Sequence, residues 1–365
     1  VSFYVYFYTW TYLLAFNAFV FLLALIRKDW DQAKKVMGVS IAAAIVGIPY
    51  LTHTLAVSRH PFYAELGPRF GFVSSRVPFI SKTMIAAAVL FGATYRYLPS
   101  RTKSFFVPLL LTGFFTVNQH LITGRYFRFD NHHHWYYSKP MVMILLTTIL
   151  FGLIKKFNWR PFISKALAAL MILFFFYNGA LVQAVSYKAA LPEVIEEQRY
   201  AELFRWLNES TPKDSAVLSS LSISKFIPAV THNNTYHHGG ALYTFQPTSR
   251  YAHIYLVYTY LKGIERDKIE AYLESEREDI SSFIFGYTYL VQPGICHICF
   301  PDRVIADLAG KYRELNDENF IEFVKKFPVD YIAWDKISDP NWNPGKFKLP
   351  EVAKFGEIMV YMVPR

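Results

Sequence analysis

The first half of the chain contains runs of about twenty residues with almost no charged side chain, and these runs limit the folds it can adopt. Residues 36–57 and 166–185 show the pattern most clearly. A bilayer core about 30 Å thick needs about 20 apolar residues per helix, so such runs predict membrane-spanning helices. After residue 187, charged side chains recur every few positions. The sequence therefore predicts a transmembrane domain at 1–187 and a folded domain at 188–365.

Six runs approach the required length, so we predict an α-helical polytopic membrane domain of about six transmembrane helices. The predicted spans are 3–26, 36–57, 82–98, 104–122, 140–154 and 163–187. Several of them begin or end beside tyrosine or tryptophan, as an interfacial aromatic belt would require. The chain opens inside an apolar run and without an initiator methionine. We therefore expect further membrane sequence N-terminal to Val1.

Lysine and arginine gather in the short loops after the first, third and fifth predicted spans. These residues are Arg27, Lys28, Lys34, Lys35, Arg96, Arg101, Lys103, Lys155, Lys156, Arg160 and Lys165. Short basic loops face the cytoplasm. We therefore predict an integral protein of the plasma (inner) membrane whose C-terminal domain is extracytoplasmic. Much of the net charge of +10 lies in these loops, so the charge indicates topology and no nucleic-acid partner is expected.

The second outer loop, residues 118–137, is the densest group of polar and aromatic side chains in the chain. Polar side chains at the end of an apolar helix are costly unless they meet partners or line a wet cavity. Guanidinium groups make paired bonds to phosphate oxygens, and aromatic rings can stack on a sugar. We therefore predict a site for a phosphate headgroup. Its candidate residues are Asn118, His120, Arg125, Arg128, Asp130, His132, His134 and Trp135.

Three interpretations of the histidine run in this loop stay open. His132 and His134 can ligate a metal together with Asp130, although no HExxH-type spacing supports such a site. A histidine can instead act as a general base, because its pKa lies near neutrality. The third interpretation is interfacial packing of polar aromatic side chains. The first outer loop, 59–81, reads as chain lying on the membrane, either as a connector or in contact with a substrate.

The region after residue 187 alternates helical and strand patterns. Helices are predicted at 191–207, 250–264, 268–274 and 316–327, a further apolar element at 281–291, and strands at 216–219, 329–334 and 358–363. This alternation predicts a small extracytoplasmic α/β domain. No GxGxxG, Walker, GxSxG or HExxH pattern occurs in it, so we expect a binding or structural cap. Its loop 231–241 contains the turn-like cluster His237-His238-Gly239-Gly240, which either approaches a ligand or only connects two elements.

Cys296 and Cys299 are the only cysteines of the chain. In an oxidising outer compartment a disulfide is the first expectation for this CxxC pair. Half of a zinc site is an alternative, although His297 is poorly placed to complete it. Thioredoxin-like chemistry is another, but it needs the pair at a helix N-terminus within a βαβ unit. Flanking prolines at 293 and 301 favour a disulfide that staples a loop.

The layout resembles the later half of polytopic membrane glycosyltransferases of the GT-C class. More narrowly, it is similar to bacterial membrane proteins in which a span ending NQxxxTG opens an Arg/His/aromatic outer loop, here 118–137. The shared patterns continue with a WLxxxTPxD entry at 206–218 and an IPAxT turn at 227–231. They end with a VDYI strand and a VY-containing terminal strand.

This resemblance implies a membrane glycosyltransferase that transfers a hexose or pentose from a polyprenyl-phosphate-linked sugar at the outer membrane face. The implied partners are the lipid bilayer and that donor, and a divalent metal ion is the one cofactor left open. GT-C enzymes carry their acidic catalytic residue in the first outer loop. No such segment is recognisable here, so we expect that residue upstream of Val1. The alternative is a non-catalytic integral membrane protein with an extracytoplasmic binding or assembly domain.

Overall fold

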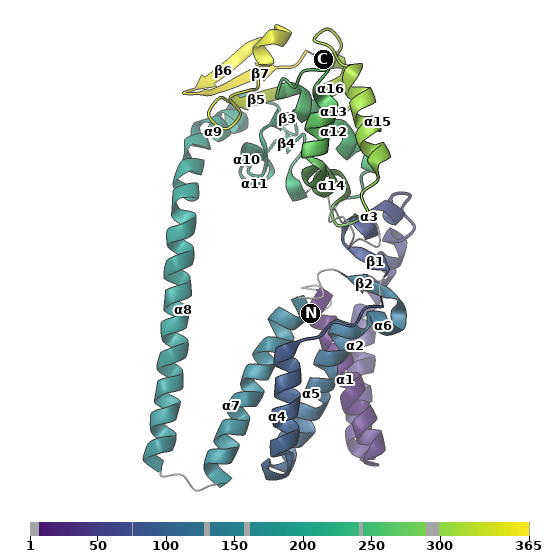
Figure 1. Cartoon of the computed structure of the whole chain (residues 1–365), viewed down its shortest axis with the longest axis vertical. Helices are drawn as coiled ribbons and strands as arrows, with labels where there is room; N and C mark the ends of the chain where they lie inside the picture. Colours follow the sequence, from purple (N-terminus) through teal and green to yellow (C-terminus); the bar gives the residue numbers. More distant parts are fainter. Residues whose placement is uncertain are drawn as a thin grey trace. The chain divides into compact units, whose positions relative to one another are not determined.

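The structure, a computed structural model, describes residues 7–74, 76–127, 132–156, 161–240, 244–289 and 299–364 (Figure 1). The chain divides into two compact units. The first, which we call the helical unit, comprises Val1–Tyr63 and Gly71–Gln183. The second, the α/β unit, comprises Ala64–Phe70 and Ala184–Arg365.

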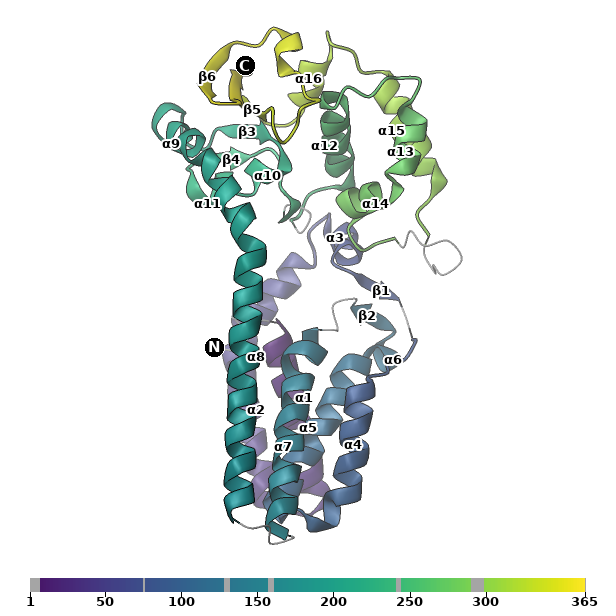
Figure 2. The same ribbon diagram turned by 60° about the vertical axis from the view of Figure 1, so that its left-hand side comes forward.

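The helical unit is built from long apolar helices. They are α1 (Phe7–Ile26), α2 (Trp30–Val57), α4 (Lys82–Thr94), α5 (Ser100–Asn118), α7 (Lys139–Lys156) and the first part of α8 (Pro161–Glu197). α1 packs against α2 and α5, and α4 packs against α5 and α7, so these helices run side by side in Figures 1 and 2. Met84 and Leu145 are fully buried in their shared core. Ser81 caps α4 by accepting a hydrogen bond from the backbone N–H of Met84 (3.3 Å).

Four helices among the described residues are long and apolar enough to cross a membrane. They are Thr9–Ile26, Trp30–Val57, His133–Ile154 and Pro161–Ser210. The prediction of six spans is therefore met only in part. The helix in predicted span 82–98, α4, has 13 residues and so extends about 20 Å, short of the bilayer core. The helix in predicted span 104–122, α5, has 19 residues but opens with a polar turn, which makes it less apolar than the others.

Short elements complete the helical unit. They are β1 (Phe72–Ser74), η2 (Tyr95–Tyr97), α6 (His120–Thr123), β2 (Arg125–Phe127) and the π-helical segment η4 (His133–Ser138). β1 and β2 pair antiparallel, which joins the two loops that we predicted to face outward. α6 ends at Gly124, whose φ of +69° favours glycine and whose N–H donates to the His120 carbonyl (2.8 Å).

The described part of the α/β unit contains a five-stranded mixed sheet in the order β4-β3-β5-β7-β6. The strands are β3 (Ala216–Ser219), β4 (Asn234–Thr235), β5 (Tyr331–Asp335), β6 (Glu351–Phe355) and β7 (Ile358–Met362). β3 is parallel to β4 and β5, whereas β7 is antiparallel to β5 and β6. A tight turn containing Gly356 (φ +59°) connects β6 to β7. The predicted α/β character of this region is confirmed.

Helices cover both faces of this sheet because successive strand residues point to opposite sides. Ile332 and Trp334 belong to one apolar cluster, and Ala333 between them belongs to the other. The first cluster includes α12 (Thr248–Leu261), α13 (Ile269–Ser275), α14 (Arg277–Phe285), α15 (Asp302–Arg313) and α16 (Phe320–Val324). The second includes α9 (Ala201–Ser210), α10 (Leu221–Ser224) and α11 (Ile227–Val230). The unit is therefore a three-layer α/β arrangement.

Several predicted elements of this region differ in extent from those observed. The predicted helix 191–207 consists of the end of α8, a 3₁₀ turn η5 (Gln198–Tyr200) and α9. The predicted apolar element 281–291 overlaps α14, which starts four residues earlier, and the predicted helix 316–327 is reduced to α16. The strands β4 and β6 and the helix α15 were not predicted. Local patterns thus found most elements but placed their ends poorly.

A segment of the first outer loop is part of the α/β unit. α3 (Tyr63–Arg69) carries Arg69, which is 1% exposed and donates from Nη2 to the Gln246 carbonyl (2.6 Å). Glu65 of the same helix accepts hydrogen bonds from the backbone N–H (2.6 Å) and the hydroxyl of Thr248. Charged side chains are rarely buried unless they are paired. These residues of loop 59–81, predicted to lie on the membrane, thus pack as an integral piece of the second unit.

Candidate functional site

Two of the predicted headgroup residues hold loops of the helical unit together. Asn118, the last residue of α5, accepts a hydrogen bond from the backbone N–H of Phe79 (2.8 Å) and donates to the Phe79 carbonyl (3.1 Å). His120 is fully buried, and its Nε2 lies 2.7 Å from the Val77 carbonyl, which requires Nε2 to carry the proton. Their polarity is therefore used to satisfy backbone groups of the first outer loop.

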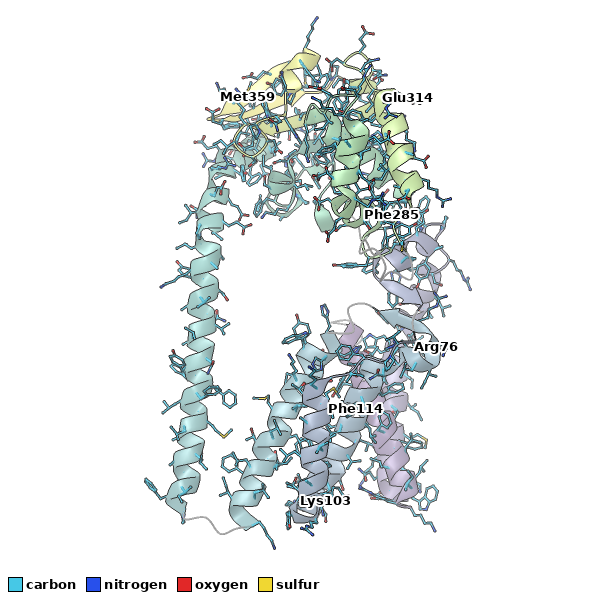
Figure 3. The ribbon with its side chains drawn as sticks, in the orientation of Figure 1. Arg76, Lys103, Phe114, Phe285, Glu314 and Met359 are labelled. Atoms are coloured by element: carbon cyan, nitrogen blue, oxygen red, sulfur yellow. The ribbon has the colours of Figure 1, made fainter. Side chains whose placement is uncertain are left out.

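Arg125 lies on β2 and is exposed. Its backbone carbonyl accepts hydrogen bonds from Gln119 Nε2 (3.2 Å) and Thr123 Oγ1 (3.3 Å), which fix the strand behind the end of α6. Arg76, labelled in Figure 3, donates from Nη1 to the Leu121 carbonyl (2.7 Å) at the same helix end. The backbone at Arg125 is thus well fixed while its side chain is exposed to solvent.

The histidine run forms the start of the π-helical segment. The His134 ring is buried and meets Phe79 edge to face (centroids 5.7 Å apart), whereas the His132 ring packs on Tyr136 (5.4 Å). Residues two apart on a helix do not face each other, so these contacts place the two rings on different sides. Trp135 is exposed, and the Lys139 ammonium lies 3.0 Å from its ring centroid, a cation–π contact.

The predicted phosphate site is therefore divided between packing and surface roles. Arg125 and Trp135 are exposed, whereas Asn118, His120 and His134 are engaged inside the unit. Arg128 and Asp130 lie outside the described residues. Among the residues that the structure does describe, no group of three or more His, Cys, Asp or Glu could hold a metal ion.

The predicted CxxC disulfide is only partly within the described structure. Cys299 is disulfide-bonded. Cys296, its predicted partner, lies outside the described residues. The pairing proposed from the sequence therefore stays a prediction.

A cavity of about 760 Å³ opens at the carboxyl ends of the three parallel strands of the α/β unit. We call it the strand-end cleft. Ser220 and Ser222 follow β3, His237 follows β4, and Ser338 and Asp339 follow β5. The chain passes from β3 to β4 on one side and then to β5 on the other, so the strand order reverses beside β3. Ligands of open α/β sheets bind outside the carboxyl ends of the strands at such a reversal.

Helices on one face of the sheet supply the rest of the cleft wall. The aromatic lining residues are Tyr255 and Tyr258 of α12, Phe283 of α14, and Trp342. The charged lining residues are Lys262, Glu276, Asp279 and Asp339. An apolar pocket with a few convergent polar groups is the usual form of a small-molecule site, and such sites occupy about 300–1,000 Å³.

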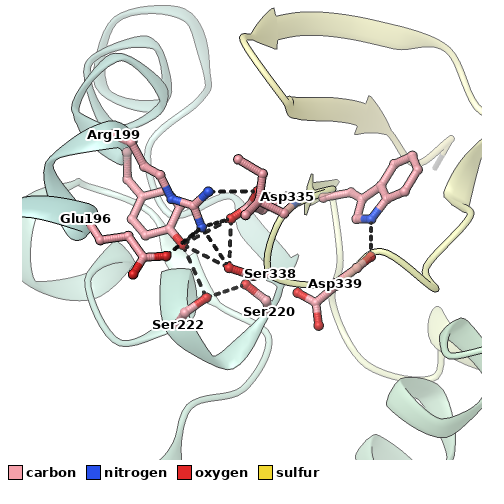
Figure 4. A network of polar contacts seen from close by, with 10 residues as sticks. Glu196, Arg199, Ser220, Ser222, Asp335, Ser338 and Asp339 are labelled. Atoms are coloured by element: carbon pink, nitrogen blue, oxygen red, sulfur yellow. Dashed lines mark hydrogen bonds and ion pairs between the residues drawn. The ribbon is translucent and has the colours of Figure 1, made fainter. Parts of the chain in front are cut away.

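Figure 4 shows the polar network around a buried carboxylate, Asp335, at the end of β5. Asp335 has no exposed surface and pairs with Arg199 of η5. It also accepts hydrogen bonds from the Tyr200 hydroxyl (3.1 Å), the Ser338 hydroxyl (2.8 Å) and the backbone N–H of Ile337 (3.0 Å). Buried charges persist in proteins when they are paired and hydrogen-bonded in this way. The network fixes the turn that carries Ser338 and Asp339.

Three residues that line the cleft each carry a buried polar atom with no hydrogen-bond partner within the described structure. The atoms are Asp339 Oδ2, Trp342 Nε1 and His237 Nδ1. Trp342 and His237 are each only 3% exposed, so bulk water does not compensate them fully. Most buried polar atoms find a partner, and an exception marks a functional site or an unseen water or ligand. These atoms make the cleft the strongest candidate site in the described chain.

Burial changes the proton affinity of two of these groups. Burial, opposed by the nearby Ser220 hydroxyl and reinforced by the nearby Asp335, raises the pKa of Asp339 to about 6. Burial lowers the pKa of His237 to about 4, and the neighbouring His238 and Arg250 add to this effect. His237 is therefore neutral at pH 7 and can donate from one ring nitrogen and accept at the other. The pKa of Asp339 lies close enough to neutrality for a neighbouring charge to change its protonation state.

Sequence reasoning singled out two residues of this cleft, His237 and Gly239, as part of a turn-like cluster that either approaches a ligand or only connects. It missed the residues around Ser220 and Asp339, which lie more than a hundred positions apart in the sequence. A usable signal was present, because buried strands at 216–219 and 331–335 each end in polar residues. Polar side chains directly after parallel strands gather at one sheet edge.

The chain was compared with protein families, curated proteins and solved structures. No protein family, curated protein or solved structure matches the chain.

Proposed function

We propose that the chain is a membrane-anchored binding protein whose α/β unit takes up a small polar ligand in the strand-end cleft. The observation that carries this proposal is that Asp339, Trp342 and His237, which line one cavity of about 760 Å³, each carry a buried polar atom without a partner in the described structure. A ligand that bonds to these atoms would remove the cost of burying them.

The fixed backbone turn after β5 supports the same proposal. The backbone between β5 and Trp342 is tightly turned, because the Asp339 N–H donates to the Asp335 carbonyl (2.9 Å) and Trp334 Nε1 donates to the Asp339 carbonyl (2.8 Å). Side chains on such a fixed turn lose little further conformational entropy when a ligand binds. The site is therefore preorganised.

The proposal is tested by ligand-induced stabilisation of the detergent-purified protein. The panel consists of glucose, glucosamine, choline, glycerol 3-phosphate and inorganic phosphate. A ligand at about 100 times its Kd stabilises the folded state by about 2.7 kcal/mol, which raises the midpoint of thermal unfolding by about 5–10 °C for a domain of this size. We expect at least one compound of the panel to produce such a shift.

A pair of matched variants locates the binding. Ser282 is exposed on α14 and lines the cleft, so Ser282→Trp places a bulky side chain in it. Ser275 is exposed at the end of α13 and does not line it, so Ser275→Trp is the control. We expect the stabilisation to disappear in Ser282→Trp and to persist in Ser275→Trp. A panel in which no compound stabilises the protein, or in which Ser282→Trp is stabilised as strongly as wild type, would refute the proposal.

For the membrane part we propose six spans, with α4 and α5 added to the four long helices. The support is their packing, since both helices contact neighbours that are themselves candidate spans. We propose further that the loops after α1, η2 and α7 are cytoplasmic and that the α/β unit is extracytoplasmic in the inner membrane, on the basis of their lysine and arginine content. In right-side-out spheroplasts, Arg59→Cys should react with an impermeant maleimide and Ser100→Cys should not. The reverse pattern would contradict this orientation.

A second candidate function is the transfer of a sugar from a polyprenyl-phosphate donor. One observation favours it. Arg125 is exposed, and the Lys139 ammonium lies over the exposed ring of Trp135. The second outer loop and the start of α7 therefore offer both cationic and aromatic side chains at the surface. Guanidinium and ammonium groups bind phosphate oxygens well. Binding of undecaprenyl phosphate should then weaken in Arg125→Ala and in Arg125→Ala/Arg128→Ala but not in the exposed control Arg101→Ala. Equal binding by all these variants would remove the case for a donor site.

A further inference from the structure

We propose that the strand-end cleft is specific for an organic ammonium compound that also carries a hydroxyl group. The inference rests on the proposed function of the cleft as a ligand site and adds the chemical class of the ligand. Three independent properties of the lining lead to it: its charge, its aromatic surface, and the types of polar atoms without partners in the described structure.

The charged lining side chains favour a cation. Glu276, Asp279 and Asp339 contribute carboxyl groups, whereas Lys262 contributes the single lining ammonium. The Lys262 ammonium is already bound to the Tyr272 hydroxyl (3.1 Å). A cleft lined mainly by one sign of charge attracts ligands of the opposite sign and repels those of its own. Phosphate and carboxylate ligands are therefore disfavoured.

The buried carboxylate at the end of β5 does not change this balance. Asp335 is neutralised by its ion pair with Arg199. Neither residue is among those that line the cavity. The local excess of negative charge therefore arises from the lining carboxylates themselves.

The aromatic lining forms one connected surface. The ring centroid of Tyr258 lies 5.6 Å from that of Trp342 and 6.2 Å from that of Phe283, and Tyr255 lies 5.5 Å from Phe283. Aromatic rings attract cations through their negative faces, and aromatic cages are the usual recognition element for quaternary ammonium groups. Carboxylates beside such rings add an ion pair. The combination is typical of ammonium recognition.

The atoms without partners in the described structure specify further ligand groups. Asp339 Oδ2 is an acceptor, so it requires a donor such as an ammonium N–H or a hydroxyl. Trp342 Nε1 is a donor only, so it requires an acceptor that a bare ammonium group lacks. A hydroxyl oxygen supplies this acceptor without adding negative charge. Both requirements are met by an amino alcohol or an amino sugar.

The test compares each ammonium ligand with a neutral analogue. Choline is paired with its neutral isostere 3,3-dimethylbutan-1-ol, and glucosamine is paired with glucose. Isothermal titration of the detergent-purified full chain gives the dissociation constants. We expect the ammonium member of at least one pair to bind at least tenfold more tightly than its neutral partner.

Matched variants show whether the lining carboxylates cause this preference. Glu276 is half-buried and lines the cleft, whereas Glu278 is exposed two residues further along and does not. Glu276→Gln should weaken binding of the ammonium ligand about fivefold to tenfold, the effect of one charge at close range in a partly solvated site. Glu278→Gln should leave it unchanged. Asp339→Asn should weaken it at pH 7.5 without weakening the neutral ligand.

The outcomes separate this inference from the proposed function. If neutral and ammonium members bind equally, or if only glucose or a phosphate compound binds in the cleft, the cleft is a ligand site but the ammonium inference is wrong. If neither ammonium compound binds, the inference is also wrong. The proposed function itself fails only if no compound of the wider panel binds in a way that Ser282→Trp abolishes.

Discussion

Removing the buried carboxylate of Asp335 should destabilise the α/β unit strongly. Asp335 is fully buried and accepts hydrogen bonds from Arg199, Tyr200, Ser338 and the backbone of Ile337. Asp335→Ala leaves the Arg199 guanidinium, which is 23% exposed, without its buried counter-ion. Breaking a buried ion pair by removing one partner costs roughly 3–5 kcal/mol.

Thermal unfolding of the detergent-purified protein measures this cost. One kcal/mol shifts the midpoint by about 2–4 °C for a domain of 150–250 residues, so Asp335→Ala should lower the midpoint of the α/β unit by roughly 6–20 °C. The matched control is Asp302→Ala, because Asp302 is 90% exposed where it pairs with Arg277. An exposed pair contributes about 0–1 kcal/mol, so the control should stay within about 4 °C of wild type.

A double substitution separates the ion pair from the packing around it. Replacing both charges, as in Asp335→Leu/Arg199→Met, removes the need to compensate either one and should cost less than Asp335→Ala. The reasoning is refuted if Asp335→Ala unfolds within about 3 °C of wild type, or if the double variant is less stable than Asp335→Ala.

Three further predictions concern other parts of the chain. Arg69→Ala removes the charge-assisted bond to the Gln246 carbonyl and should cost roughly 1.5–3 kcal/mol. Chymotrypsin, whose aromatic cleavage sites the substitution leaves intact, should then cleave the 59–70 region faster, whereas an unchanged rate would show that α3 does not need Arg69. Because burial raises the pKa of Asp339 to about 6, the folded protein binds this proton more tightly than the unfolded chain. The stability of wild type relative to Asp339→Asn should therefore be greatest near pH 4 and fall as the pH rises through about 6. A pH-independent difference between their thermal midpoints would contradict this. Asn118→Ala removes both side-chain bonds to the backbone of Phe79 and should speed amide hydrogen exchange at 77–81, while unchanged exchange would rule out its clamping role.

The long helices could be predicted from the sequence because their signal is local. An apolar run such as 36–57 is sufficient to predict α2, although the helix starts six residues earlier, at Trp30. Asp29 caps it by accepting a hydrogen bond from the Gln32 N–H (3.0 Å). The α-helix observed within the predicted span 82–98 is shorter than predicted, because the run ends in the short 3₁₀ turn η2 and α4 stops at Thr94. Hydropathy alone does not report where a helix ends.

The contribution of α3 to the α/β unit could not be predicted, because it depends on contacts between distant segments. Arg69 and Gln246 are 177 positions apart, and nothing in either local sequence identifies the other. The loop residues near Asn118 illustrate the same difficulty. Their residue types suggested a headgroup site, but the atoms they meet are backbone carbonyls and amides, which every sequence contains.

The strand-end cleft was only partly visible in the sequence. The strands 216–219 and 329–334 were predicted, and both are followed by polar residues. Their order in the sheet and their parallel pairing bring Ser220 and Asp339 to one edge. That order follows from how the helices between them cover the sheet, which no local pattern specifies.

The measurement that tests the account most directly is the reactivity of a cysteine placed in the cleft. Ser222→Cys puts a thiol among the lining residues, and Ser275→Cys is the exposed control outside it. With the tightest-binding compound of the panel at saturation, maleimide labelling of Ser222→Cys should slow at least tenfold while labelling of Ser275→Cys stays unchanged. Equal labelling of Ser222→Cys with and without the compound would contradict the claim that the strand-end cleft is the ligand site.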